Sequence, residues 1–436
     1  MPGSEPALRV AAGDGEAELI CPAAQIFDAA AMARALSDAE ATAADSRALR
    51  MDAVRLLREA QRAGRERIAE ALRARPFEAR AATRAYAWLM DRIVTPAWQV
   101  ASERLHPRPT PTEGERIAVL AVGGYGRGEM APHSDVDLLF LSPWKITAWA
   151  ESVTESILYM LWDLKLKVGQ ASRTVKDCLK YGAEDMTIRT ALLEHRFLCG
   201  NAALAEDLGR TLQRDLFEGT ERAFIEAKLA ERDARHRKQG ARYMVEPNVK
   251  EGKGGLRDLQ SLYWIAKYVH HVDRAAALVD LGVFRPEEYD RFRRAETFLW
   301  AVRCHMHLIA GRAVEQLTFD MQVDVAEAMG YRDSAARRGV EHFMQDYFLH
   351  ATAVGDLTRI FLTSLEAEHR KGTPLLERLF RRTPRVRKGY AVVNGRLAIA
   401  DDAAFLADKL NLLRLFEEAL RTGLLIHPDA MRLVRA

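Results

Sequence analysis

Two aspartates separated by one residue, Asp135 and Asp137, are the residues in this sequence best placed to do chemistry. They open the apolar run DVDLLFL, which predicts a buried β-strand. Because side chains alternate faces along a strand, both carboxylates point the same way, with Cα atoms about 6–7 Å apart. Two acids on one face repel each other unless a cation neutralises them. The pair therefore predicts a site for Mg²⁺, which completes its shell with water and substrate phosphates.

A glycine turn precedes the acid pair. The apolar run Ile117–Gly124 ends in Gly123 and Gly124, which lack Cβ and let a triphosphate approach the backbone amides. Arg127 follows in the loop with a guanidinium suited to bidentate phosphate contact, and Ser134 adjoins the first aspartate. A lone DxD is commonly a solvated strand end, and a lone GG is commonly a simple turn. Their combination in one strand–loop–strand unit predicts a nucleotidyl-transfer site.

The elements around this unit are mostly helices, because apolar residues recur at three- and four-residue spacing. We expect an α+β, predominantly helical protein, with a small mixed sheet flanked by helices and followed by a helical domain. Pro76 and Pro96 are expected to interrupt the first long helical region. The proline-rich segment His106–Glu115 predicts an extended connection. Strands are expected over 117–124, 135–141 and 168–175, with a helix over 151–167 and nearly continuous helix over 201–368.

Four domains follow from this pattern. We expect an N-terminal helical region with its proline-rich connection over 1–114, a nucleotidyltransferase core over 115–200, a helical domain over 201–370, and a C-terminal unit over 371–436. In that last unit, Asn394-Gly395 lies between two apolar runs and predicts a β-hairpin. One helix over 402–421 is expected to bury Phe405, Leu406, Leu410, Leu413, Leu415 and Phe416. Another begins at Pro428, so close to the last residue that we expect a longer natural chain.

The composition limits the possible partners. The 436 residues carry a formal charge of only +3, which gives no nucleic-acid footprint. Uncharged stretches are no longer than about ten residues, too short for a membrane span, and the N-terminus does not resemble a secretory signal. The four cysteines lie far apart, so no cysteine-based zinc site is expected. These features predict a cytoplasmic protein that binds neither nucleic acid nor membrane.

The string GGYGRGEMAPHSDVDLLFL resembles the signature of the DNA polymerase beta-type nucleotidyltransferase superfamily. Within it, the sequence is most similar to the PII uridylyltransferases. Further similarity lies in Tyr243–Tyr268, Phe298–Tyr331 and Glu341–Phe348, so the resemblance runs from about Glu115 to the C-terminus. It implies transfer of UMP from UTP to a tyrosine of the nitrogen-signalling protein PII, with release of pyrophosphate, when glutamine is scarce.

The resemblance also implies roles for individual residues. Asp135 and Asp137 would be the catalytic residues and the ligands of Mg²⁺, for which Mn²⁺ could substitute, and one of them would help to deprotonate the tyrosine. Gly123, Gly124, Arg127 and Ser134 would bind the nucleotide. Many superfamily members carry a third carboxylate on a following strand, but the expected strand here has none. Asp163 is only a weak candidate, so the metal shell stays open.

The block KEGKGGLRD interrupts the helical region at 250–258. Its cations Lys250, Lys253 and Arg257 would grip the triphosphate or present a surface to PII. The block is equally well explained as a turn between helices, with Gly255 before the second helix and the cations solvated.

Other features point away from further activities. His305 and His307 lie two apart in an expected helix, so they do not share a face and do not indicate a metal site, and His270-His271 is also read as structural. Full-length family members add an HD phosphohydrolase domain that removes UMP and ACT domains that sense glutamine. The chain has no His-Asp dipeptide, so UMP removal is not expected, and glutamine would act only on the full-length protein. Two alternatives are a protein adenylyltransferase using ATP and a catalytically inactive nucleotide-sensing module.

Overall fold

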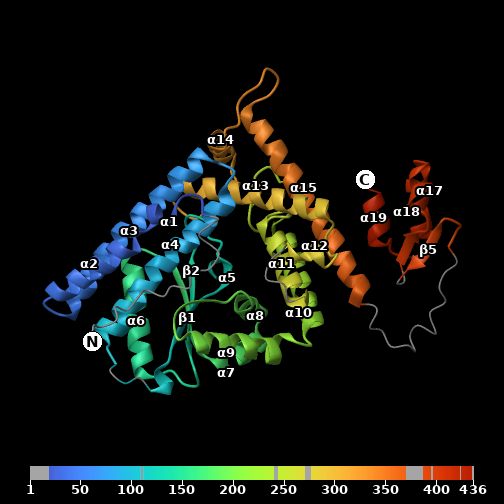
Figure 1. Ribbon diagram of the computed structural model, residues 1–436. Coiled ribbons are helices and arrows are strands. Elements are labelled where there is room, and N and C mark those ends of the chain that lie inside the picture. Colours follow the sequence, from blue (N-terminus) through green and yellow to red (C-terminus); the bar gives the residue numbers. More distant parts are fainter. Residues whose placement is uncertain are drawn as a thin grey trace.

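The computed structural model describes residues 19–108, 110, 112–239, 244–270, 276–369, 386–393, 396–422 and 424–434. It is a predominantly helical α+β protein with a small mixed sheet, as the sequence predicts (Figure 1). One hydrophobic core continues from the N-terminal helices through the sheet into the helices that follow it. Within the described part of the chain, no helix combines the length and hydrophobicity needed to cross a bilayer.

The main sheet has four strands in the order β3-β2-β1-β4. They are β1 (Ala118–Ala121), β2 (Val136–Ser142), β3 (Val168–Thr174) and β4 (Arg196–Gly200). β2 and β3 are parallel and are connected by α6 (Ala148–Asp163), while β1 is antiparallel to both of its neighbours. The three expected strands are confirmed, but the first ends at Ala121 because the glycines after it form the short helix α5 (Gly123–Gly126). β4 was not predicted.

Two long helices dominate the N-terminal region, and one of them packs against the sheet. The first helices are α1 (Ala23–Ile26), α2 (Ala29–Thr42), α3 (Ser46–Ala74) and α4 (Ala79–Gln99). α4 contacts both α3 and β4, so it links the N-terminal helices to the sheet. The expected break at Pro76 is confirmed, but the one at Pro96 is wrong. Pro96 lies inside α4, and a wider π-helical turn over Val100–Leu105 follows it, an adjustment that keeps the chain helical past the proline.

Helices dominate the region after the third strand. They are α7 (Val175–Glu184), α8 (Met186–Leu193), α9 (Ala202–Leu212), α10 (Glu221–Gln239), α11 (Leu256–His270), α12 (Ala277–Asp280), α13 (Pro286–Ala310), α14 (Phe319–Ala328) and α15 (Gly339–His369). α13 packs against α4, α11, α14 and α15. This packing holds the later helices against the N-terminal ones.

The C-terminal elements have a small core of their own, formed by Leu397, Phe405, Leu415 and Ala430. β5 (Tyr390–Val393) and β6 (Arg396–Ile399) pair antiparallel as expected, although the turn residues Asn394-Gly395 lie outside the described residues. The single helix expected over 402–421 is wrong: α17 (Asp402–Leu406) and α18 (Leu410–Thr422) are separate. The Asp408 carboxylate accepts a hydrogen bond from the Leu410 N–H, which starts the second helix.

The burial expected for that region is also only partly correct. Phe405 and Leu415 are buried, whereas Leu406, Leu410, Leu413 and Phe416 are exposed. The break between the two helices changes which side chains share a face, and periodicity along one continuous helix did not predict that change. α19 (Pro428–Leu433) begins at Pro428 as expected.

Candidate active site

The two aspartates lie at the start of β2. Asp135 precedes the strand, and its carboxylate pairs with the Nζ of Lys167 at 3.0 Å. The Lys167 side chain is 82 % exposed, so this ion pair is weak and replaceable. Burial and the neighbouring Asp135 carboxylate raise the pKa of Asp137, while Lys250 and Lys167 act in the opposite direction. The two carboxylates repel each other, and a bound divalent cation would offset this repulsion.

The donor set fits Mg²⁺ better than a metal held only by protein. Among the described residues there is no group of three or more His, Cys, Asp or Glu side chains that could hold a metal ion. Two carboxylates leave most positions of an octahedral shell to water and phosphate oxygens, which is the way Mg²⁺ is usually bound. The weak third candidate, Asp163, ends α6 and does not line the cavity that contains the pair.

Glycines surround the Asp137 carboxylate. Gly123 has a φ of +59°, and a Cβ there would lie 3.3 Å from Asp137 Oδ2. A Cβ on Gly169 of β3 would overlap Asp137 Oδ1. Gly126 packs against the backbone carbonyl of Glu194, which leaves no room for a side chain. The glycine turn therefore gives close access to the acid pair and also fits the loop tightly against the start of β4.

Arg127 is already paired with protein carboxylates. It contacts Glu194 Oε2 at 2.5 Å and Glu129 Oε2 at 3.1 Å, and its side chain is only 10 % exposed. Burial alone would lower the pKa of Arg127, but the two carboxylates raise it, so the guanidinium stays charged. Ser134 has a local partner too, because its Oγ accepts a hydrogen bond from the Ala131 N–H at 2.9 Å. Contact of either residue with a nucleotide stays a prediction.

A single cavity of about 840 Å³ joins most of the residues that the sequence singles out. Its lining includes Gly123, Gly124, Arg127, Ser134, Asp135, Asp137, Lys250 and Arg257. The first six come from the sheet and its loops, Lys250 comes from the turn before α11, and Arg257 lies in the first turn of that helix. Lys253, in the same block, is not part of the lining. The structure thus brings the acid pair and two of the three predicted cations to one space.

The glycine-rich block is both a turn between helices and a wall of this cavity. The Asp258 carboxylate accepts a hydrogen bond from the Gly254 N–H at 2.9 Å and contacts Arg235 and His236. Gly254 has a φ of +78°, and its backbone packs so closely on Ala351 that a Cβ would overlap the Ala351 carbonyl oxygen. These contacts fix the block and start α11 at Leu256. The block is therefore the expected turn before a helix, whereas binding of its cations to a nucleotide or to PII stays a prediction.

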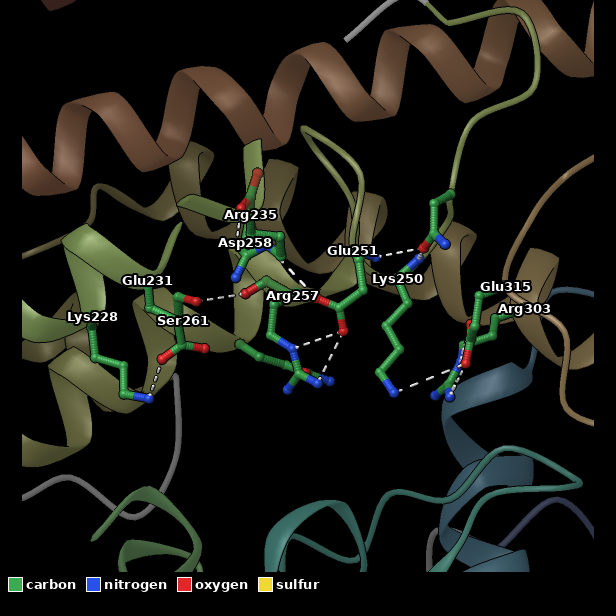
Figure 2. Close-up of polar contacts among 12 residues, drawn as sticks. Lys228, Glu231, Arg235, Lys250, Glu251, Arg257, Asp258, Ser261, Arg303 and Glu315 are labelled. Atoms are coloured by element: carbon green, nitrogen blue, oxygen red, sulfur yellow. Dashed lines mark hydrogen bonds and ion pairs between the residues drawn. The ribbon is translucent and has the colours of Figure 1, made fainter. Parts of the chain in front are cut away.

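The cations of this wall are paired with carboxylates, as Figure 2 shows. Lys250 Nζ lies 4.0 Å from Glu315, whose carboxylate also binds Arg303 at 2.6 Å. Arg257 contacts Glu251 at 3.2 Å. Burial and the two neighbouring guanidinium groups lower the pKa of Lys250. Lys250 in turn lowers the pKa of Asp137, and both residues line the same cavity.

Several cavity residues were missed by the sequence analysis: Lys167, Gly169, Arg173, Lys228, Trp264 and Arg303. Gly169 and Arg173 lie on one face of β3, and alternation along the expected strand offered a signal for them. Lys228 and Arg303 lie on long helices among many other charges. No local pattern distinguishes those two from solvated cations.

The histidines have structural environments. His305 and His307 are both buried in α13. The ring nitrogen Nε2 of His305 lies 3.1 Å from the Pro76 carbonyl oxygen, and His307 Nδ1 accepts a hydrogen bond from the His133 N–H at 3.3 Å. His270 ends α11, and His271 lies outside the described residues.

Comparison with known families gives two partial matches. Residues 223–362 match the family model of GlnD PII-uridylyltransferase, and residues 17–161 match that of glutamate-ammonia ligase adenylyltransferase. The second match contains the glycine turn and the acid pair, whereas the first contains the glycine-rich block and α13. The two matches therefore cover opposite walls of the same cavity.

Whole-chain relatives are similar over almost the entire sequence. A bifunctional uridylyltransferase/uridylyl-removing enzyme of Ruegeria pomeroyi is 67 % identical over 94 % of this chain and 45 % of its own length. The enzymes of the same name from Cereibacter sphaeroides and Rhodopseudomonas palustris are 62 % and 45 % identical, over 96 % and 88 % of this chain and 45 % and 42 % of their own lengths. The chain thus spans less than half the length of these relatives.

Proposed function

We propose that this chain, which belongs to the family of bifunctional uridylyltransferase/uridylyl-removing enzymes, transfers UMP from UTP to a tyrosine hydroxyl of the PII protein and releases pyrophosphate. The observation that carries the proposal is the cavity that places Asp135 and Asp137 opposite Lys250 and Arg257. A metal-bound polyphosphate needs carboxylates to hold the metal ion and cations to bind its phosphate oxygens, and this cavity contains both. The reaction would take place in the cytoplasm.

In this proposal the acid pair holds the metal and handles the proton. Asp135 and Asp137 would hold Mg²⁺ or Mn²⁺, and the bound ion would supply positive charge beside the phosphates. The bond from the tyrosine oxygen to the α-phosphorus forms while the bond to the pyrophosphate oxygen breaks. A tyrosine hydroxyl has a pKa of about 10, so its proton needs an acceptor. Burial raises the pKa of Asp137, which favours this carboxylate as the proton acceptor.

The other residues would bind and orient the nucleotide. Gly123 and Gly124 leave their backbone amides open to the triphosphate, and Ser134 holds the loop before the acid pair. Lys250 and Arg257 would approach the phosphates from the opposite wall. Arg127 would act mainly by fixing this loop to Glu194. Lys253, outside the cavity lining, would contact PII rather than UTP.

The proposal covers only part of what the longer relatives are named for. We propose that this chain adds UMP and does not remove it, and that glutamine control belongs to the full-length protein. Both statements rest on the family resemblance and on the missing His-Asp dipeptide.

Two alternatives remain distinguishable. The adenylyltransferase match over 17–161 supports ATP as the donor, but it covers the part of the site that both reactions share. The match over 223–362 and the relatives at 67 % and 62 % identity favour UTP. A catalytically inactive nucleotide sensor is suggested only by the missing third carboxylate, and two carboxylates suffice for a Mg²⁺ ion that keeps water and phosphate ligands.

The decisive experiment compares UTP and ATP with purified PII. With Mg²⁺ and UTP, mass spectrometry of PII should show one added UMP on a tyrosine, and ATP should give little modification. Asp135→Asn and Asp137→Asn should each abolish the product while leaving the protein folded by circular dichroism. Unmodified PII with UTP and efficient modification with ATP would replace the proposal with the adenylyltransferase. Nucleotide binding without any modification or pyrophosphate release would favour the sensor.

A further inference from the structure

Lys228 is a buried lysine on the wall of the active-site cavity. Its side chain is 3 % exposed, and its partner Glu231, one turn later in α10, is 48 % exposed. The amine lies 5.0 Å from the ring centre of Trp264 and 5.7 Å from that of Phe224. Burying an ammonium group is costly, and an apolar residue would fill the same space at lower cost. A ligand that needs the charge would account for it.

The surroundings of Trp264 indicate what kind of ligand this is. Lys228, Arg257 and Arg127 all lie near its ring, at 5.0, 5.3 and 5.8 Å from the ring centre. The indole side chain is buried, with 5 % exposure. Because cations border the ring, this part of the wall offers charged groups and not an open aromatic face for a base to stack on. Each of these cations is already paired with a glutamate, so the ligand that would bind them is an anion able to replace a carboxylate.

Lys228 also belongs to a series of cations in the cavity that contains the acid pair. Figure 2 shows Lys228, Arg257, Lys250 and Arg303 with their charged ends on the same side, and all four line the cavity. We call these four residues the cation row. Each is paired with a glutamate: Lys228 with Glu231, Arg257 with Glu251, and Lys250 and Arg303 with Glu315. These carboxylates neutralise the row, and a phosphate group that binds the same cations would replace them.

We propose that Lys228 is a pyrophosphate-binding residue, which with Arg257 holds the terminal phosphates of the nucleotide and then the departing pyrophosphate. Lys228 stands at one end of the row and is followed by Arg257, Lys250 and Arg303, and the whole row shares its cavity with the acid pair. When the bond between the α-phosphorus and the bridging oxygen breaks, the electron pair stays on that oxygen. The cation row would bind the negative charge that develops on the leaving group. This inference rests on the proposed function.

The test measures binding of inorganic pyrophosphate, with Mg²⁺ present, by isothermal titration calorimetry on the full chain. Lys228→Met should weaken binding about tenfold or more, because a charged hydrogen bond is lost. Lys228→Arg should keep most of the affinity. Glu231→Gln should tighten binding, by up to about fivefold, because it removes the carboxylate that competes for the amine. Lys238→Met is the matched control, since Lys238 is exposed on the same helix and does not line the cavity.

The opposite signs of the two variants separate binding from a structural role. If Lys228 only stabilised the fold, Lys228→Met and Glu231→Gln would both lower the melting temperature, and neither would change the affinity of the folded protein for pyrophosphate. That result would overturn the proposal, as would a wild-type chain that binds no pyrophosphate. If pyrophosphate binds as expected but PII is never modified, the proposed function fails while this inference stands. If PII is modified and the variants bind pyrophosphate like wild type, the proposed function stands and the inference about Lys228 fails.

Discussion

Gly169 lies directly opposite Asp137 in the parallel register of β2 and β3, and a Cβ at position 169 would overlap Asp137 Oδ1. β3, the strand on which a third carboxylate would be expected, therefore contributes a glycine that leaves room for the Asp137 carboxylate. The Asp137 carboxylate occupies the volume that any side chain at 169 would need. Gly123 borders the other oxygen of the same carboxylate. Two glycines from different segments thus set the position of this side chain.

Gly169→Ala should impair the acid pair without unfolding the protein. The added methyl group must push the Asp137 carboxylate away, so we expect the affinity for Mn²⁺ in the presence of UTP to fall about tenfold or more. Electron paramagnetic resonance of bound Mn²⁺ would measure this loss. Gly209→Ala is a suitable control, because a Cβ there would lie at an ordinary 3.4 Å from the His195 ring. Equal Mn²⁺ affinity in both variants would contradict the importance of this contact.

Arg127→Met should lower the free energy of unfolding strongly. Glu194 has a fully buried side chain and depends on Arg127, so removing the guanidinium leaves a buried carboxylate unpaired, at a cost of about 3–5 kcal/mol. Urea unfolding would measure the change. The double variant Arg127→Met/Glu194→Gln should recover part of it.

Arg222→Met provides the comparison for a solvated arginine. Arg222 and Glu226 are 85 % and 64 % exposed, so this change should cost less than about 1 kcal/mol. Arg127→Met with wild-type stability and a selective loss of UTP affinity would show that Arg127 is chiefly a phosphate ligand.

Glu296 should make stability depend on pH. Burial and the nearby Glu129 raise the pKa of Glu296 to about 7, although Arg80, at 3.0 Å, acts in the opposite direction. A carboxyl group whose pKa is higher in the folded state takes up a proton on folding. Its stabilising contribution is therefore present at low pH and is lost as the pH rises from about 4.5 through about 7.

Glu296→Gln should accordingly gain stability relative to wild type as the pH increases. We expect a gain of about 1–3 kcal/mol between pH 5 and pH 8, measured by urea unfolding at both values. Glu287→Gln, an exposed position on the same helix, should show no such trend. A difference between Glu296→Gln and wild type that stays constant with pH would rule out this explanation.

Lys250 and Lys253 should affect different substrates. Lys250 lines the cavity and acts on Asp137, so Lys250→Met should raise the KM for UTP about tenfold or more. Lys253 does not line the cavity, and Lys253→Met should instead raise the KM for PII. Steady-state kinetics with each substrate varied in turn would test both. An equal rise in the KM for UTP in the two variants would show that Lys253 also contributes to nucleotide binding.

The sequence predicts best what depends on neighbouring residues. The acid pair, its strand and the glycine turn form one continuous segment, and the start of α19 at Pro428 follows from local chemistry. The paired state of Arg127 was not predictable, because Glu194 lies 67 positions away and becomes its partner only through β4. Lys228 was missed for a similar reason: only the packing of α10 against α11 distinguishes it from an ordinary charge on a helix.

Helix continuity was also misjudged where tertiary context decides it. Pro96 was expected to break a helix, but buried packing around α4 keeps that segment helical. Asp408 was read as part of a helix, but its carboxylate begins a new one. In both cases the residue type alone allows either outcome, and the surrounding chain selects one.

The two walls of the cavity are made at different times during synthesis. Asp137 and Lys228 are 91 positions apart, and Trp264 comes later still. At about 5–20 residues per second, a ribosome needs roughly 5–20 s to pass from the acid pair to the first residue of the cation row. During that interval the acid pair has the solvent-exposed Lys167 as a countercharge, whereas Lys250 has yet to be made. On the proposed function, a chain in which α10 and α11 have not yet docked lacks the part of the site that would bind the terminal phosphates.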